Sequence, residues 1–413
     1  MPLAARRGDL FREYAGIPSN AKLLIYLNFI PSIAVGFIYT DLSYFLPVIQ
    51  KIPSPWPWIT ITVMGMTLVA ESIPFGMVAD RYGRRRMMIL GNLCASLSLI
   101  GFALTQNIAL ILLTAVLEGT GEASFAVSVG ALLAEKAGDE KRTAAFSLLA
   151  FLGWIAGALG SFVISSVSVL NGVGLSLAQA HVVLYIVVGL LGLSVTPLLF
   201  RIGESSTLSV RRDVLPRKSG RVLVRYLGYS VIIAVGAGLF VPLMAFWYKA
   251  AYGVPDTISG PVLGLTNVLT AGVVFMSPVL ARRLGLVKAT VVTQASSTIF
   301  MVLIPSSPTF GVAASLYIVR VFLMNLSNPL TSSLIMGLVS PDERGSASGI
   351  SAALWRMPNA LSTVVGGTLT SEGFLGLPFY IATVLYAAGI SAFWFMFKDA
   401  RLPEERVRVQ APT

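Results

Sequence analysis

Long apolar runs separated by short polar segments make up most of this chain. A run of about 20 apolar residues crosses a bilayer as a helix. These runs are continuous rather than alternating, which favours helices over the strands of a membrane barrel. Twelve are present, at residues 22–48, 58–80, 87–106, 108–134, 143–169, 178–200, 222–248, 258–281, 286–304, 309–338, 345–370 and 376–397. The pattern predicts an all-α membrane protein with twelve transmembrane helices.

Composition excludes several classes of protein. Of the 413 residues, 55% are hydrophobic and 12% are charged. A soluble enzyme of this length could not bury that much apolar surface. Disordered chains have the opposite composition, with few hydrophobic and many charged residues. Cys94 is the one cysteine, so a disulfide scaffold is excluded. We find no Walker sequence, catalytic triad or metal-ligand cluster. The sequence therefore predicts no enzyme, no cofactor and no metal.

The basic residues predict the orientation of the helices. If the N-terminus is cytoplasmic, 26 of the 30 Lys and Arg residues fall on the inner side, and only Lys51 and Lys249 fall on the outer side. This asymmetry is typical of a multi-pass protein with both termini in the cytoplasm, and we expect it in the cell (plasma) membrane. The net charge of +11 then reflects topology and contact with membrane lipids. It does not indicate a nucleic-acid partner.

The chain also matches itself when it is shifted by 202 residues. Residues 76–83 fall on 278–285, and residues 142–147 fall on 344–349. A repeat of this length indicates two six-helix halves, an architecture in which the substrate site lies between the halves near the bilayer midplane. We therefore divide the chain into a cytoplasmic N-terminal segment (1–21), an N-terminal bundle (22–200), a cytoplasmic linker (201–221), a C-terminal bundle (222–397) and a cytoplasmic tail (398–413).

A conspicuous motif lies between the second and third spans. It reads Gly76-Met77-Val78-Ala79-Asp80-Arg81-Tyr82-Gly83-Arg84-Arg85-Arg86. Gly76 would let its helix approach a neighbour, Gly83 would permit a tight turn, and Asp80 could accept hydrogen bonds from a helix N-terminus.

Through this motif, G-x-x-x-D-R-x-G-R followed by Lys or Arg, the chain resembles the major facilitator superfamily of secondary transporters, and the twelve spans and the repeat extend the resemblance over the whole chain. The resemblance implies a cytoplasmic latch made of Gly76, Asp80, Arg81, Gly83, Arg84 and Arg85. In the family the partner of the acid is the start of the eleventh helix, here near residues 346–348. The second copy of the motif has Arg282 in place of the acid, so only the first copy would latch.

Six ionisable residues lie inside the apolar runs, where such groups are costly and usually functional. They are Asp41, Glu71, Glu118, Glu122, Arg320 and Arg356. All the acids lie in the first half and both arginines in the second, and the 202-residue shift places Glu118 on Arg320. Glu118 and Glu122 share one helix face. Because two such close carboxylates should not both ionise in a low dielectric, we predict a proton-coupling site there, with Asp41 and Glu71 as further candidates.

The roles of the two arginines stay open. Arg320 and Arg356 either bind an anionic substrate or act as counter-ions to the acids. Tyr39, Trp154 and Asn325 are candidates to line the same site. His181, near the outer end of the sixth span, is expected at the membrane interface.

Two departures from family patterns weigh against a standard drug/proton antiporter. The fourth helix has Ala115 where an arginine is expected before Gly119 and Gly121, and the fifth has Ala158 in place of a proline after Gly157. We predict a monomeric, proton-coupled secondary transporter of a small organic solute, working by alternating access. Alternatives are an exporter of lipophilic cations, an organic-anion/proton symporter using Arg320 and Arg356, and a non-transporting membrane sensor.

Overall fold

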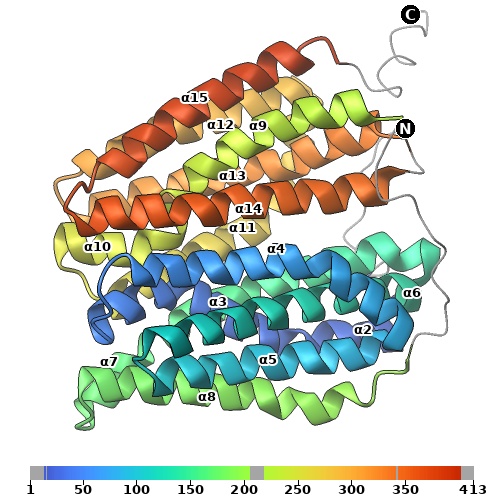
Figure 1. Ribbon diagram of the computed structural model, residues 1–413. Coiled ribbons are helices and arrows are strands. Elements are labelled where there is room, and N and C mark those ends of the chain that lie inside the picture. The colour runs from blue at the N-terminus through green and yellow to red at the C-terminus, as the bar shows by residue number, and fades with distance from the viewer. Residues whose placement is uncertain (1–13, 15, 205–217, 341–342, 401–413) are drawn as a thin grey trace, which may run out of the picture. The chain divides into compact units, whose positions relative to one another are not determined.

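The computed structural model describes residue 14 and residues 16–204, 218–340 and 343–400, and within them the chain is helical with no strand (Figure 1). The helices are α2 (Ser19–Leu27), α3 (Phe29–Tyr44), α4 (Trp56–Tyr82), α5 (Arg84–Leu104), α6 (Ile108–Val163), α7 (Ser166–Gly172), α8 (Leu177–Leu199), α9 (Gly220–Gly238), α10 (Met244–Tyr252), α11 (Asp256–Leu284), α12 (Leu286–Leu303), α13 (Phe310–Leu338), α14 (Arg344–Ser371) and α15 (Leu377–Phe397).

The twelve predicted spans are confirmed. Ten helical stretches among the described residues are long and apolar enough to cross a membrane, and α11 and α14, with 29 and 28 residues, have the length of two more. The 56-residue α6 holds two spans, because Gly138 has a non-helical backbone (φ 67°, ψ 172°). Glycine adopts a positive φ without the penalty that a Cβ brings.

Helix contacts divide the chain into two compact units. Unit 1 comprises Met1–Val210 and Asp256–Asn267, and unit 2 comprises Arg211–Pro255 and Val268–Thr413. The first twelve residues of α11 therefore pack with unit 1, and the rest of that helix belongs to unit 2. The 202-residue repeat appears in the helix boundaries, since α5 and α12 begin 202 residues apart, as do α6 and α13. Gly83 and Gly285 precede α5 and α12, with φ values of 107° and 77°.

Glycine sets the distance between α6 and α3 in unit 1. A Cβ on Gly160 would overlap the backbone of α3 at Ile33 and Phe37, and a Cβ on Gly36 of α3 would overlap the backbone of Gly157. Small residues let the two helix backbones touch, which replaces hydrophobic burial as a source of packing energy within a membrane.

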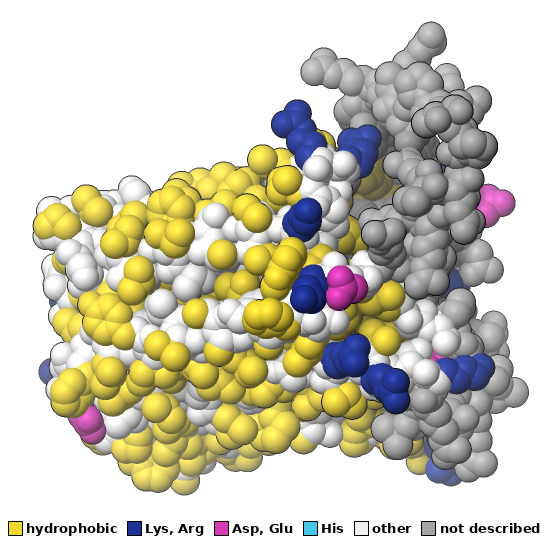
Figure 2. All heavy atoms as spheres, turned by 90° about the horizontal axis from the view of Figure 1, so that it is seen from above, with side chains coloured by type: hydrophobic (Ala, Val, Ile, Leu, Met, Phe, Trp, Pro, Cys, Tyr) yellow, Lys and Arg dark blue, Asp and Glu magenta, His cyan; other side chains and the backbone are white. Residues whose placement is uncertain are grey.

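The surface matches a lipid environment. Large apolar side chains are exposed on both units, for example Leu113 (63%) in unit 1 and Phe395 (70%) in unit 2. Figure 2 shows one face, on which apolar side chains cover most of the surface and Lys and Arg gather toward one end. Charge thus lies where a membrane-spanning helix reaches water.

Glutamate side chains accept backbone hydrogen bonds on either side of residues 205–217. In unit 1, the carboxylate of Glu204 accepts a hydrogen bond from the backbone N–H of Arg85 at the start of α5 (3.0 Å). In unit 2, Glu343 accepts from the backbone N–H groups of Lys218 and Ser219, just before α9 (both 2.8 Å). Each glutamate satisfies orphan donors and the positive dipole at a helix N-terminus.

Candidate functional site

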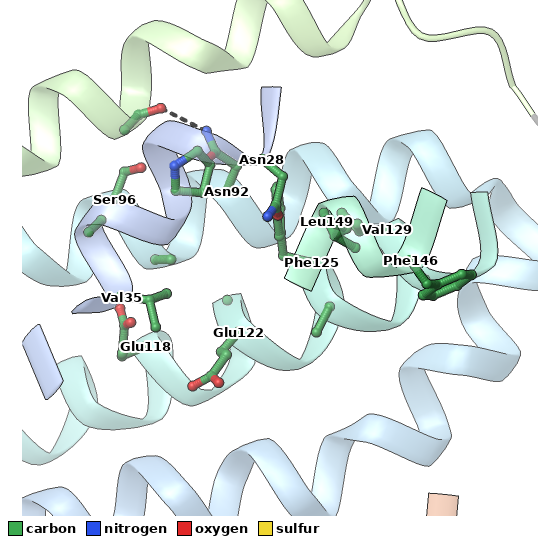
Figure 3. Close-up of a pocket in the computed structure, with 17 residues that line it drawn as sticks. Asn28, Val35, Asn92, Ser96, Glu118, Glu122, Phe125, Val129, Phe146 and Leu149 are labelled. Carbon is green, nitrogen blue, oxygen red and sulfur yellow. Dashed lines mark hydrogen bonds between the residues drawn. The ribbon is translucent and has the colours of Figure 1, made fainter. Parts of the chain in front are cut away.

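A cavity of about 350 Å³ lies within unit 1 (Figure 3). Its walls come from α3, α5, α6 and α8 and are mainly apolar, with a few polar side chains among them: Asn28, Asn92, Ser96, Glu118 and Glu122. Figure 3 shows the two glutamates on successive turns of α6, with Asn28 and Asn92 opposite in this view. Among the described residues that line it, none is basic. An apolar pocket with a few convergent polar groups is typical of a small-molecule site.

Glu118 is the more deeply buried of the two glutamates. Its side chain is 2% exposed although it lines the cavity, and its carboxylate forms no ion pair with a described basic residue of unit 1. Its hydrogen-bond partner is the hydroxyl of Ser98 on α5. An ionised carboxylate in this position lacks a counter-charge, which is a costly state in a low dielectric.

The Ser98 hydroxyl can serve either form of Glu118. Ser98 Oγ also lies 2.8 Å from the carbonyl oxygen of Ala95. A hydroxyl has one proton to donate and a carbonyl only accepts. Ser98 donates to an ionised Glu118, and it can accept from a protonated Glu118 while it donates to Ala95.

Glu122, one turn further along α6, has a different environment. Its carboxylate accepts a hydrogen bond from the hydroxyl of Tyr39 on α3 (2.6 Å). Gly119 and Gly121 lie beside the two acids. A Cβ on Gly119 would press on the backbone of α4, and one on Gly121 on the backbone of α5. Gly121 also lines the cavity, whereas Gly119 is not among the lining residues.

The other two predicted acids lie outside this cavity. Glu71 on α4 is half-buried, and its Oε2 is buried without a hydrogen-bond partner. Asp41 on α3 is 0% exposed, and neither of its carboxylate oxygens has a partner. Neither residue lines the cavity of Glu118, so the structure divides the four acids into separate sites.

Arg320 is enclosed by aromatic rings in unit 2. Its side chain is 4% exposed and donates a hydrogen bond to the hydroxyl of Tyr386 (2.6 Å). Its guanidinium carbon lies 4.9 Å from the ring centroid of Phe240 and 5.4 Å from that of Tyr386. Within unit 2, no described acid forms an ion pair with it. Cation–π contacts and a hydroxyl thus stabilise this charge.

The remaining substrate-binding candidates are spread over both units. Trp154 in unit 1 and Arg356 in unit 2 are exposed. Asn325 on α13 donates hydrogen bonds to Thr270 (3.2 Å) and to the carbonyl of Val321 (3.0 Å). Of the substrate-binding candidates in unit 1, only Tyr39 is brought to an acid of the cavity, through Glu122.

The signature motif is arranged around its own arginines. Asp80 accepts hydrogen bonds from Arg84 (2.8 and 3.0 Å), and Arg84 also reaches Glu135 (3.4 Å). Arg85 contacts Glu204 (3.8 Å), and Arg81 lies over the ring of Tyr82.

Two glycines of the motif differ in their need for a missing side chain. At Gly83 the positive φ confirms the predicted turn. At Gly76 a Cβ would meet only Val127, at an ordinary 3.5 Å, so close approach does not require this glycine. The predicted partner of Asp80 at residues 346–348 includes the side chain of Ser346, which lies outside the described residues.

Sequence reasoning missed two residues that share a site with Asp41. His181 was expected at the interface, yet it is 0% exposed and bonded to Asp256 (2.6 Å). Asp256 follows Pro255 and opens α11, two residues before the predicted span 258–281. The sequence offered a signal for the position of Asp256, because acidic residues are enriched in the first turn of a helix.

The sequence of the chain matches known membrane proteins. The family model of the Major Facilitator Superfamily matches residues 23–363. The chain is 20% identical to the uncharacterized membrane protein YJR124C of Saccharomyces cerevisiae, over 97% of this chain and 99% of the yeast protein.

Solved structures share the fold. The nucleoside transporter NupG superposes with a TM-score of 0.73 at 13% identity (92% of this chain, 99% of NupG). A bacterial homologue of the human lysosomal transporter Spinster gives 0.73 at 13% (92% and 96%). The human organic anion transporter MFSD10 (TETRAN) gives 0.63 at 14% (91% and 100%). At these identities the likeness concerns the fold.

Proposed function

The chain belongs to the major facilitator superfamily, a family of transporters rather than enzymes, and we propose that it couples the movement of a small organic solute to protons through Glu118. Alternating access carries the solute past a central site in this architecture. Glu118 binds and releases the proton, and Glu122, which accepts a hydrogen bond from Tyr39, forms the adjoining wall of the cavity. The protein acts as a monomer in the cell membrane, with both termini in the cytoplasm.

One observation carries this proposal: Glu118 lines a cavity yet is almost fully buried, with a serine as its partner and no ion pair to any described basic residue of unit 1. A permanently ionised carboxylate would need a counter-charge there. A carboxylic acid needs only the hydroxyl, and it can ionise when the cavity opens to water. That alternation is what proton coupling requires.

The cavity also favours a class of solute. It offers two asparagine amides and two carboxyl groups, together with the aromatic rings of Phe125 and Phe146. This set suits an uncharged or positively charged solute with a ring or apolar body. An anion finds no basic partner in this cavity, and Arg320 is already enclosed by rings. Relatives by fold are named for nucleosides and for organic anions, and we favour the former class.

The test uses purified protein in proteoliposomes loaded with a pH-sensitive dye. Uridine, ethidium and p-aminohippurate serve as the neutral, cationic and anionic probes. We expect proton movement with uridine or ethidium, and a loss of at least an order of magnitude in Glu118→Gln. Glu372→Gln, which removes an exposed acid of unit 2, is the matched control.

Two results would overturn the proposal. Proton-driven flux that persists in Glu118→Gln would remove its coupling role, and flux of p-aminohippurate that depends on Arg320 would establish the organic-anion alternative. An independent readout is the infrared band of a protonated carboxyl group. One component of this band should respond to pH in the parent protein and in Glu372→Gln, and that component should be lost in Glu118→Gln.

A further inference from the structure

A second group of buried titratable residues lies in unit 1 apart from the cavity. It consists of Asp41 on α3, His181 on α8 and Asp256 at the start of α11, and each side chain is 0% exposed. Donor atoms from the three lie within 4.8 Å of one another. None of the three lines the cavity that holds Glu118, so this group is separate from the proposed coupling site.

Hydrogen bonds fix one proton of the imidazole. His181 Nδ1 lies 2.8 Å from the carbonyl oxygen of Leu177, and because a carbonyl only accepts, Nδ1 carries a proton and donates it. His181 Nε2 lies 2.6 Å from Oδ2 of Asp256. That short contact requires a second proton, on one atom or the other. The remaining oxygen of Asp256, Oδ1, accepts from the backbone N–H of Thr257 (2.9 Å).

Asp41 completes the charge balance. Both of its oxygens are buried, with the side chains of Tyr185 and Asp256 close by, and within unit 1 no described lysine or arginine pairs with Asp41 or Asp256. With one proton shared between His181 and Asp256, the net charge of the group equals that of Asp41. An ionised Asp41 leaves one uncompensated negative charge in the interior, which is costly, whereas a protonated Asp41 leaves the group neutral.

We propose that Asp41, His181 and Asp256 form a second proton-binding site, which holds the first turns of α11 on unit 1 while both protons are present. Other titratable groups that face it are the hydroxyls of Tyr44 and Tyr185. The ring of Tyr44 stacks on His181 at 6.2 Å. The hydroxyl of Tyr185 lies beside Asp41 and is buried.

The site lies where its charge acts on a whole helix segment. Residues Asp256–Asn267 pack with unit 1, and α11 continues from there into unit 2. Beside the proton site, Ser165 donates a hydrogen bond to the carbonyl of Thr257 (2.8 Å), and a Cβ on Gly260 would lie 2.9 Å from the carbonyl of Ser161. The three side chains are fully buried beside this close packing, where an uncompensated charge is costly, so loss of a proton favours separation of α11 from unit 1.

The geometry favours protons over a metal ion. Two ligands of one tetrahedral zinc ion, each bound at about 2.1 Å, lie about 3.4 Å apart. His181 Nε2 and Asp256 Oδ2 are only 2.6 Å apart, which fits a charge-assisted hydrogen bond.

The inference rests on the proposed transport function, but its test does not measure transport. Ser259, buried on α11, becomes a reporter in the full-length variant Cys94→Ser/Ser259→Cys in proteoliposomes. We expect a water-soluble maleimide to label it at least tenfold faster at alkaline than at mildly acidic pH, after correction for thiolate reactivity. Cys94→Ser/Ser128→Cys is the matched control, since Ser128 is a buried serine of α6 without a hydrogen-bond partner, and it should show no such increase.

A neutral replacement of Asp41 isolates the proton. Asp41→Asn in the Ser259→Cys background should keep labelling slow at both pH values, because the proton that Asp41 releases is no longer part of the group. Hydrogen exchange of the peptide 256–267 in the unmodified protein, corrected for the intrinsic rate, repeats the test without substitution.

Three outcomes would overturn the proposal: labelling and exchange that do not change with pH, a pH response that survives Asp41→Asn, or stoichiometric metal in the purified protein that His181→Ala removes. The two proton sites are distinguishable. Glu118→Gln should lose proton-driven flux and keep the pH response at position 259, so either claim can fail alone.

Discussion

The two units share a repeat, yet they treat a buried charge at the equivalent position differently. Glu118 in unit 1 and Arg320 in unit 2 lie 202 residues apart on the corresponding helices α6 and α13. Glu118 lines a cavity and has one serine as its partner. Arg320 is enclosed by Phe240 and Tyr386. A repeat thus preserves the helix framework while each copy surrounds its charge differently: a cavity and a serine in one unit, and aromatic rings in the other.

The largest effect is expected at Arg320. Arg320→Ala should destabilise the protein by about 3–5 kcal/mol, because it leaves a cavity and strips the buried Tyr386 hydroxyl of its partner. Tyr386→Phe keeps the ring under the guanidinium and should cost about 1 kcal/mol. Thermal denaturation in detergent measures both. If Arg320→Ala melts like the parent but abolishes flux, Arg320 is a binding residue and the contrast with Glu118 is lost.

Helix packing should respond alike in the two units. Gly160→Val and Gly366→Val should each cost about 1–3 kcal/mol, because either side chain meets the backbone of a neighbouring segment, at Ile33 or at Leu239. Gly153→Val is the control in unit 1, since the nearest atom to a Cβ there, Ser32 Oγ, is 4.0 Å away. Denaturation curves that rank Gly153→Val with the other two would show that these contacts do not limit packing.

Ser98 should affect transport more than stability. Ser98→Ala removes the hydroxyl that bonds Glu118 in either protonation state, so we expect proton-driven flux to fall several-fold while the stability falls by only about 1 kcal/mol. Ser124→Ala removes a buried hydroxyl that bonds a carbonyl of its own helix, and flux should remain at the parent level. Equal flux in the two variants would contradict the role of Ser98.

The smallest effect is expected at Asp80. Its carboxylate pairs with Arg84, and the two side chains are 31% and 16% exposed. Because partly exposed ion pairs contribute little, Asp80→Asn should cost at most about 1 kcal/mol. A larger loss of stability on chemical denaturation would show that Asp80 has a structural role beyond this pair.

The sequence predicted the framework well, because its signals are local. Length and hydropathy placed the twelve spans, and Gly83 indicated a turn with a positive φ, which other residues rarely adopt. Buried charge inside an apolar run identified Glu118. The partners were not predictable, because Ser98 meets Glu118, and His181 meets Asp256, only through tertiary packing of different helices. The backbone neighbours of Gly119 and Gly121 were not predictable either, because the sequence does not show which helix packs against each glycine.

The glutamate anchors at the ends of residues 205–217 have a practical consequence for engineering. Glu204 bonds to α5 within unit 1, and Glu343 bonds the residues before α9 within unit 2, so each attachment is complete within its own unit. A chain cut between residues 204 and 218 keeps both anchors. The two fragments, expressed together from separate genes, should therefore each fold around an intact helix start. A fluorescent protein fused at the cut would show whether the two fragments assemble, and it would leave the hydrogen bonds of Glu204 and Glu343 in place.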